Sequence, residues 1–231
     1  GGKDSTYAIE YALKNKFDIA YLLSIKPTRK DCYLFHFSTV EQTKDLSKIL
    51  DIPLIYTKCN VANPEKEAIM IKKIIMKNPV DAVLLGGTGL QETQINTLKK
   101  VLSKINVKVF ATHQGKNHEL VLKEMINKGY EIVITQIASD GLKKWLGRKL
   151  TKENFENFRL DSIKYGFHIG GEGGYFDTLV VNGPIFKKKL QIISVDLVYE
   201  DEYSGHIVVR ESKLINNKRL LSRNAVGRDY N

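Results

Sequence analysis

Cysteine is scarce in this sequence, and it has no long apolar run. The two cysteines, Cys32 and Cys59, lie far apart without a C-x-x-C pair, so we expect neither a zinc site nor a disulfide framework. A reducing cytoplasm is therefore the expected compartment. No apolar run approaches the roughly 20 residues that a membrane-spanning helix needs, and no signal peptide is visible at the start. These features predict a soluble, cytoplasmic globular protein that does not bind membranes.

Acidic residues are outnumbered by basic ones, which gives a net charge of +10 at pH 7. Such an excess raises the question of nucleic-acid binding. The lysines are dispersed, however, with a single triplet at residues 187–189 and acidic residues between them, a pattern typical of a solvated surface. Direct contact with nucleic acid is therefore not expected. At 231 residues with 42% hydrophobic content, the chain is long enough for one large domain or two modest ones.

The stretch Gly1-Gly2-Lys3-Asp4-Ser5 is the strongest functional signal at the front of the chain. Two adjacent glycines let a backbone turn sharply and approach a ligand closely, and a lysine, a carboxylate and a hydroxyl follow at once. Residues 6–13 then have apolar side chains at helical spacing, so the free N–H groups of the loop and the positive end of a helix point the same way. This arrangement predicts a phosphate site, although the adjacent glycines differ from the G-x-x-x-x-G-K-[ST] loop.

Strand and helix patterns alternate through the first 137 residues. Apolar runs predict strands at residues 18–25, 51–56, 80–85, 107–111 and 131–137, with a short extended segment at 32–36. Helices are predicted at residues 40–50, 64–77, 91–104 and 117–127. This order predicts an α/β fold with a doubly wound, mostly parallel sheet, whose ligands bind beyond the carboxyl ends of the strands. The glycines of Gly86-Gly87-Thr88-Gly89 should then lie on the same rim as the first loop.

The pattern changes after residue 137, which predicts a domain boundary. We expect an ATP-binding type domain at residues 1–138 and a smaller α+β substrate domain at 139–231. Short helices are predicted at 142–146 and 152–164, and strands at 190–199 and 206–210 should face one another across a turn. The polar stretch from about residue 213 is expected to be a loosely held tail.

A second glycine-rich stretch, residues 168–180, contains His168, Glu172 and Asp177. Four glycines with two carboxylates and a histidine predict a backbone that approaches a ligand closely and offers Glu172 and Asp177 to a cation or an amine. The stretch could instead be a glycine-rich hairpin with solvated acids. His168 is expected to be structural rather than a ligand, and the other histidines show no ligand spacing.

Together, the two stretches resemble a known family. The front loop is similar to the S-G-G-x-D-S pyrophosphate loop of ATP pyrophosphatases. With residues 171–180, which resemble a G-E-G-G-E-[YF]-[ED]-[TS] segment, it resembles the archaeal and eukaryotic diphthine–ammonia ligase family. Residues 182–188 are similar to the family's D-G-P-L-F-K-K stretch, and residues 140–150 to its D-x-L-G-R-x-L region. The resemblance extends to about Gln191.

This resemblance implies a HUP-like parallel sheet, preceded by a short strand and a serine before Gly1. It also implies an ATP-dependent ligase, in which ATP activates a carboxylate as an acyl adenylate with release of pyrophosphate. Ammonia then converts the adenylate to an amide and releases AMP. The implied acceptor is diphthine on elongation factor 2, and a homo-oligomer is left open.

The resemblance also implies a role for each site residue. Mg²⁺ would be held by Asp4, whose oxygen ligands suit it. ATP would be bound by the following residues: Gly1, Gly2, Lys3, Ser5, Ser24, Ile25, Gly86 and Gly87. In that set, Lys3 offsets the charge of the departing pyrophosphate, and Ser24 and Ile25 contact adenine through the backbone. Catalysis would fall to Lys3 and Asp4, together with Glu172 and Asp177, which bind ammonium and help to deprotonate it.

The sequence departs from the family pattern in three places. Tyr175 stands where the family has glutamate, residues 91–94 lack a tyrosine, and residues 111–113 lack the P-L-W segment. These departures leave a divergent paralogue with another carboxylate acceptor open. The front loop would equally suit a tRNA-modifying ATP pyrophosphatase or a non-catalytic nucleotide-binding regulator.

Overall fold

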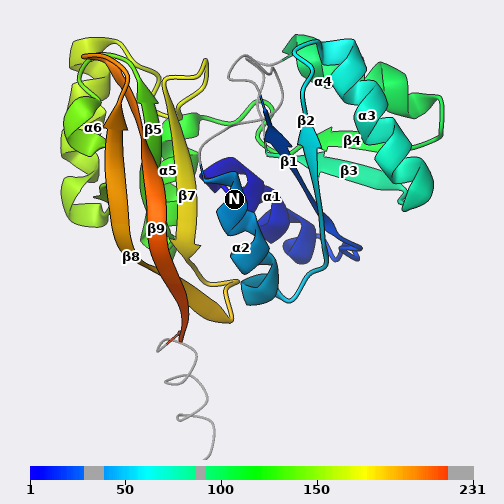
Figure 1. Ribbon diagram of the computed structural model, residues 1–231, viewed down its shortest axis with the longest axis horizontal. Coiled ribbons are helices and arrows are strands. Elements are labelled where there is room, and N and C mark those ends of the chain that lie inside the picture. Colours follow the sequence, from blue (N-terminus) through cyan, green and yellow to red (C-terminus); the bar gives the residue numbers. More distant parts are fainter. Residues whose placement is uncertain (29–38, 87–91, 218–231) are drawn as a thin grey trace, which may run out of the picture.

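The computed structural model describes residues 1–28, 39–86 and 92–217 (Figure 1). It has a mixed α/β architecture, with parallel strand pairs in the first half of the chain and an antiparallel sheet in the second. The segment predicted at 32–36, Gly87 with residues 88 and 89, and the start of the helix predicted at 91–104 lie outside the described residues. Within the described ranges, none of the helices combines the length and apolar character that a membrane span requires.

The first half contains two parallel strand pairs with helices around them. Its elements are α1 (Lys3–Lys14), β1 (Leu22–Pro27), η1 (Val40–Gln42), α2 (Thr43–Leu50), β2 (Leu54–Cys59), α3 (Pro64–Lys77), β3 (Ala82–Leu85), α4 (Glu92–Ser103) and β4 (Lys108–Ala111). β1 pairs with β2, and β3 pairs with β4, both in parallel. The described strands thus form two separate parallel pairs, and one continuous doubly wound sheet remains a prediction.

Local sequence signals explain several boundaries of these elements. Asn63 caps α3 by accepting a hydrogen bond from the Lys66 N–H at 3.0 Å, and Pro64 occupies the first turn, where its missing N–H costs nothing. Asn117 caps α5 (His118–Lys128) in the same way, and Gly129 ends that helix with a φ of 89°. β1 begins four residues later than predicted and includes Pro27, its last residue, where a ladder hydrogen bond is easily spared.

The second half forms an antiparallel sheet. Its remaining elements are β5 (Glu131–Ala138), η3 (Lys143–Trp145), β6 (Lys149–Leu150), α6 (Lys152–Tyr165), β7 (Phe176–Asn182), β8 (Lys188–Tyr199) and β9 (Ser204–Asn216). β5 is antiparallel to β6, β7 and β9, and β9 pairs with β8 as predicted. The prediction that residues 131–137 continue a parallel sheet is wrong, because a buried apolar run has the same appearance in a central strand of either kind.

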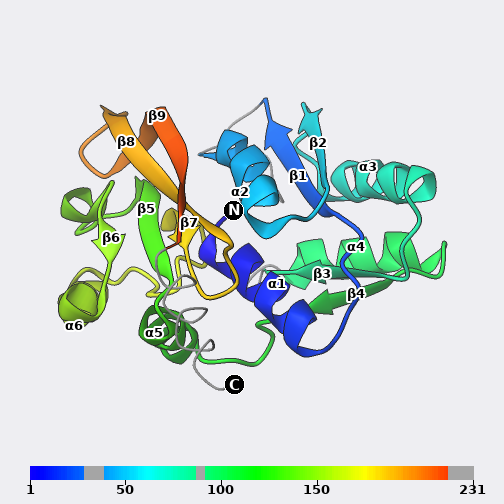
Figure 2. The same ribbon diagram turned by 90° about the horizontal axis from the view of Figure 1, so that it is seen from below.

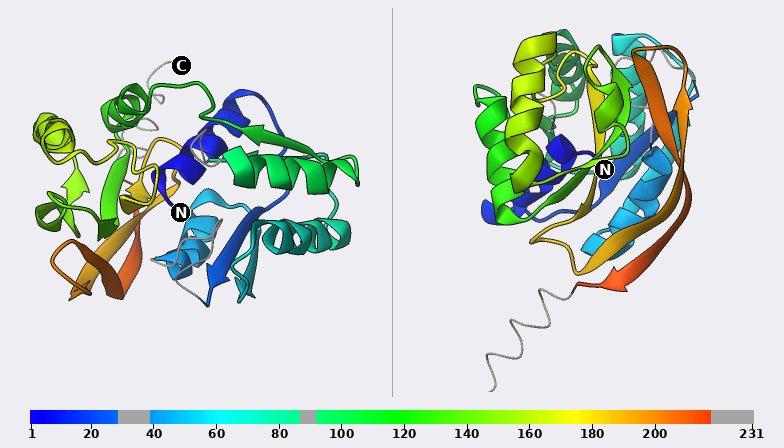
Figure 3. Two further views of the ribbon diagram at one scale, coloured as in Figure 1. Left: turned by 90° about the horizontal axis from the view of Figure 1, so that it is seen from above. Right: turned by 90° about the vertical axis from the view of Figure 1, so that its left-hand side faces the viewer.

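β9 continues to Asn216, where Lys213 to Asn216 pair with residues 188–191 of β8. This stretch is therefore paired strand rather than the start of a loose tail, because one face of a polar strand can remain in water while its backbone is paired. The hydrophobic core consists of two clusters of buried side chains. One packs α3 and α4 against β1 to β4, and the other packs α2, α5 and α6 with β5 and β7. α5 and α6 stand together on one side of the strands (Figure 3, right).

Helix α1 lies between the two halves (Figures 1 and 2) and contacts β3 on one side and β7 on the other. Glu10 of α1 is buried and accepts a hydrogen bond from the Tyr130 hydroxyl at 2.8 Å and from Lys128 Nζ at 2.8 Å. Because these partners belong to the second half, α1 is fixed to both halves. Its first turn is thereby placed where the halves meet.

Candidate functional site

The loop at the front of the chain is fixed against β7. The backbone N–H of Val180 donates to the Gly1 carbonyl at 3.0 Å, and the Lys3 N–H donates to Thr178 Oγ1 at 3.0 Å. Gly2 is the N-cap of α1 and has no side chain that could cap it. The N–H groups that follow therefore receive no side-chain cap from Gly2, and they carry the positive end of the helix dipole.

Gly86, just after β3, lies directly against the first turn of α1. A Cβ atom at this position would be 2.2 Å from the carbonyl carbon of Asp4 and 2.4 Å from the Ser5 nitrogen. Only glycine permits this backbone approach. The sequence correctly placed Gly86 on the same rim as the front loop, whereas Gly87 lies outside the described residues.

Lys3 and Asp4 form a close ion pair in this rim. Lys3 Nζ is 2.6 Å from Asp4 Oδ2, and the Lys3 side chain is only 7% exposed, so this is not the exposed pair of an ordinary helix start. His113 Nδ1 lies 3.2 Å from the other oxygen, Asp4 Oδ1. Burial would raise the pKa of Asp4, but Lys3 and His113 outweigh it and lower this pKa to about 2. Asp4 is therefore a carboxylate at any physiological pH.

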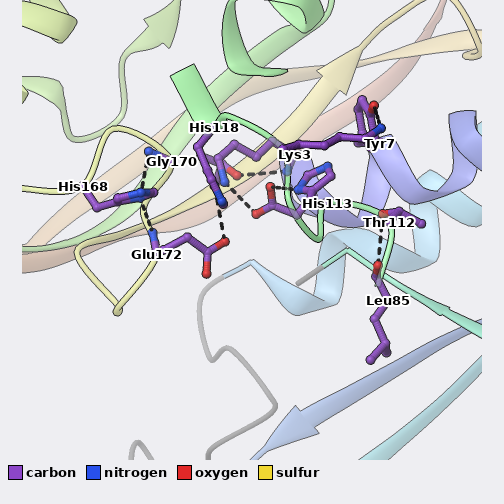
Figure 4. Close-up of polar contacts among 12 residues, drawn as sticks. Lys3, Tyr7, Leu85, Thr112, His113, His118, His168, Gly170 and Glu172 are labelled. Atoms are coloured by element: carbon purple, nitrogen blue, oxygen red, sulfur yellow. Dashed lines mark hydrogen bonds and ion pairs between the residues drawn. The ribbon is translucent and has the colours of Figure 1, made fainter. Parts of the chain in front are cut away.

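Three histidines from different segments gather beside this ion pair (Figure 4). The ring centroids of His118 and His168 are 4.8 Å apart, and those of His113 and His118 are 6.3 Å apart. His113 is 2% exposed and also packs edge-on against Tyr7 at 4.4 Å. A small pocket here is lined by both charged and apolar side chains: Lys3, Asp4, His113, His118, Val121, Leu122, Met125 and Gly170.

Glu172 is buried at this cluster, with only 6% of its surface exposed. Its Oε1 lies 3.9 Å from His118 Nδ1, and its backbone N–H donates to His168 Nδ1 at 3.3 Å. The reading of this stretch as a hairpin with solvated acids is therefore wrong for Glu172. The glycines on either side of Glu172 adopt positive φ angles: 74° at Gly171, 89° at Gly173 and 83° at Gly174. This backbone conformation explains why the loop is rich in glycine.

Asp177 lies in β7, opposite Gln136 of β5, and is half-buried. It precedes Thr178, whose hydroxyl accepts a hydrogen bond from the Lys3 N–H. The structure thus brings Lys3, Asp4, Glu172 and Asp177 together in one region. Their chemical roles remain predictions.

The other expected ATP-binding residues lie apart from one another. Ser5 is exposed in the first turn of α1. Ser24 and Ile25 lie within β1, paired with Tyr56 and Thr57, and the Ile25 side chain is buried in the core between α3, α4 and the parallel strands. A contact between this strand and adenine through the backbone stays a prediction.

His113 and His118 are the site residues that the sequence reasoning missed. No linear spacing joins them to Glu172, because they belong to the loop after β4 and to the first turn of α5. One signal was available for His113: it lies two residues after the end of β4, and ligands in parallel sheets bind beyond the carboxyl ends of strands.

Among the described residues, no group of three or more His, Cys, Asp or Glu side chains could hold a metal ion. Protein-only metal binding is therefore not indicated in this part of the chain. Mg²⁺ needs fewer protein ligands, because it is commonly held by one or two carboxylates together with substrate phosphates and waters. Asp4 alone suits that second kind of site.

Comparisons with known proteins match most of the chain. The diphthamide synthase N-terminal domain model matches residues 1–109, and the diphthamide synthase C-terminal domain model matches residues 117–215. Diphthine–ammonia ligase of Bos taurus and that of Homo sapiens are each 27% identical over 222 residues, covering 86% of this chain and 82% of the relative. The Mus musculus enzyme is 26% identical over 240 residues, covering 93% and 89%. The chain therefore belongs to the diphthine–ammonia ligase family and is an ATP-dependent ligase.

Proposed function

We propose that this ligase adenylates the carboxylate of diphthine on elongation factor 2 and transfers ammonia to it, releasing AMP and pyrophosphate. The named activity of its relatives supports the proposal. The observation that carries it is that the front loop and the glycine-rich loop share one site. His118 lines the pocket with Lys3 and Asp4, and it also faces Glu172 at 3.9 Å.

The front loop suits the terminal phosphates of ATP. The N-cap residue Gly2 provides no side-chain cap for α1, and the glycine at position 86 keeps the facing backbone in close contact with the first turn. In the proposal, backbone N–H groups at Gly1 and Gly2 and the Ser5 hydroxyl hold the phosphates, while Lys3 offsets the charge of the leaving pyrophosphate. Gly86 and Gly87 border the nucleotide, and Ser24 and Ile25 lie toward adenine.

Asp4 suits Mg²⁺ because its carboxylate stays ionised and its side chain is 30% exposed. When bound, Mg²⁺ would neutralise charge on the phosphates. Glu172 and Asp177 are the proposed ammonium ligands, and the burial of Glu172 favours a small cation over water as its partner. We also propose that the protein acts in the cytoplasm, and the proposal leaves a homo-oligomer open.

The test is amidation of diphthine-bearing elongation factor 2 with ATP, Mg²⁺ and ammonium. Wild-type protein should form amide, AMP and pyrophosphate in equal amounts. Asp4→Ala should lower the rate by at least ~100-fold while circular dichroism shows an intact fold. Asp196→Ala is the matched control, because it also breaks an aspartate ion pair, here with Arg210 on an exposed strand. Its rate should equal that of the wild type.

Other outcomes would contradict the proposal. Formation of ADP would exclude adenylation. Tight ATP binding without turnover would favour a nucleotide-binding regulator, and salt-sensitive tRNA binding with AMP release would favour a tRNA-modifying pyrophosphatase. Full activity of Asp4→Ala would remove the front loop from the mechanism.

A further inference from the structure

His118 occupies the point where the two parts of the site meet. It is the first residue of α5, and its ring is directed at the glycine-rich loop and lies beside the Lys3–Asp4 pair (Figure 4). Its Nδ1 lies 3.9 Å from Glu172 Oε1. This separation is too long for a hydrogen bond, but it is short enough for one nitrogen atom to lie within hydrogen-bond distance, about 2.8–2.9 Å, of both atoms.

His168, the neighbouring histidine, has a different task. Its Nδ1 accepts hydrogen bonds from the backbone N–H of Gly170 at 3.2 Å and of Glu172 at 3.3 Å. A nitrogen that accepts from two N–H groups carries no proton of its own, so His168 is neutral with its proton on Nε2. Its lone pair is thus used to hold the loop that positions Glu172. His118 is the imidazole whose Nδ1 faces the Glu172 carboxylate.

Gly170 makes room for His118. A Cβ atom at position 170 would lie 2.7 Å from His118 Nδ1 and 2.9 Å from its Cβ, closer than side chains tolerate. Unlike Gly171, Gly173 and Gly174, Gly170 does not have a positive φ angle, so the backbone itself does not require glycine. The requirement comes from the imidazole, which is evidence that the ring position is built into the loop.

We propose that ammonium binds between His118 Nδ1 and the Glu172 carboxylate, and that His118 accepts its proton. The proposal rests on the amide-forming function proposed above. Ammonium gives one proton to His118 Nδ1, and the resulting ammonia attacks the carbonyl carbon of the acyl adenylate. The C–N bond forms, the bond from carbon to the phosphate oxygen breaks, AMP leaves, and the second proton of the attacking nitrogen passes to solvent.

The surroundings of His118 act on both the acceptor and the donor of this proton. Burial lowers the pKa of His118, Glu172 opposes the shift, and Lys3 adds to it. His118 is therefore neutral near pH 7 and able to accept a proton. The positive charge of Lys3 and the removal of water also disfavour the cationic form of a bound amine, which weakens its hold on the proton. Asp4 acts in the opposite direction but is paired with Lys3 and His113.

The test compares two nucleophiles with the full-length chain, ATP, Mg²⁺ and diphthine-bearing elongation factor 2. Ammonium must lose a proton before it attacks, whereas hydroxylamine is already neutral near pH 7 and needs no base. In His118→Asn the ammonium rate should fall by at least ~100-fold, and the hydroxylamine rate should stay close to that of the wild type. Gly170→Ala should show the same selective loss, because its new methyl group displaces the ring.

His206→Asn is the matched control, because His206 also faces a glutamate, Glu200, at 2.8 Å but lies on the hairpin of β8 and β9. It should change neither rate. Equal losses with both nucleophiles in His118→Asn, or an unchanged ammonium rate, would overturn the role of His118 alone. Failure of the wild-type protein with both nucleophiles would instead overturn the proposed function.

Discussion

Glu131, the first residue of β5, joins four strands through one carboxylate. Its oxygens accept hydrogen bonds from Lys189 Nζ on β8 at 2.8 and 2.9 Å, from Asn182 Nδ2 on β7 at 2.9 Å, and from Lys149 Nζ on β6. Asn182 in turn accepts from buried Asn217 at 2.9 Å. We predict that Glu131→Gln, which keeps the shape and removes the charge, destabilises the antiparallel sheet.

The size of the effect follows from the pKa of Glu131. Burial would raise this pKa, but Lys149, Lys189 and Asn182 lower it from 4.5 to about 2. At about 1.4 kcal/mol for each pKa unit, this corresponds to about 3 kcal/mol, and screening of a side chain that is 23% exposed reduces it to about 2 kcal/mol. A depressed pKa stabilises the fold above the unfolded value of 4.5, and this stability is lost as the pH falls toward 2.

The assay is urea unfolding of wild-type protein and Glu131→Gln at several pH values. Near pH 7 the midpoint of the variant should be lower at an unchanged slope, equivalent to about 2 kcal/mol. The gap should narrow as the pH falls below 4.5. Glu156→Gln is the control, because Glu156 pairs with Arg159 on an exposed helix face. The urea midpoint of this variant should equal that of the wild type. The reasoning would be refuted if the two proteins had the same midpoint near pH 7, or if the difference between their midpoints stayed constant as the pH fell below 4.5.

Two further substitutions test the local structure. Gly86→Ala places a methyl group 2.2 Å from the Asp4 backbone, so we expect a loss of about 1–3 kcal/mol in unfolding free energy and weaker ATP binding, measured by thermal unfolding with and without the nucleotide. An unchanged melting temperature would contradict the close packing. Asn63→Ala removes the cap of α3 and should cost about 1 kcal/mol without affecting ATP binding, whereas Asn63→Asp should keep most of the stability.

The fold was predictable where local signals are strong. Asn63 and Pro64 fixed the start of α3, and glycine-free apolar runs located the parallel strands within a few residues. β5 was misassigned because pairing partners lie far away in sequence, and burial on both faces removes the alternation that marks an antiparallel strand. The boundary at residue 138 stays a prediction. Pairing of β5 with β7 and β9, together with family matches that meet between residues 109 and 117, favours a boundary before α5.

The site was predictable from its motifs but not from its contacts. The front loop and the loop around Glu172 are rich in glycine, and this richness marks them in the sequence as places of close backbone approach or positive φ angles. His113 and His118 carry no such mark. Their place in the site depends on contacts among the loop after β4, the start of α5 and the glycine-rich loop. Residue spacing and hydrophobic periodicity in the sequence do not predict such contacts.

His113 changes the meaning of the departures from the family pattern. It stands in the segment that lacks P-L-W, which had suggested a change on the acceptor side, yet its ring contacts Asp4 in the proposed phosphate half. Both oxygens of Asp4 are therefore engaged, one by His113 and one by Lys3. On the proposed function, Mg²⁺ would compete with Lys3 rather than with His113, because an unbranched lysine side chain can turn toward the phosphates while the imidazole of His113 packs edge-on against Tyr7. Asp4 would then pair with Mg²⁺ and Lys3 with the phosphates, so the charges of both side chains would be compensated before and after ATP binds.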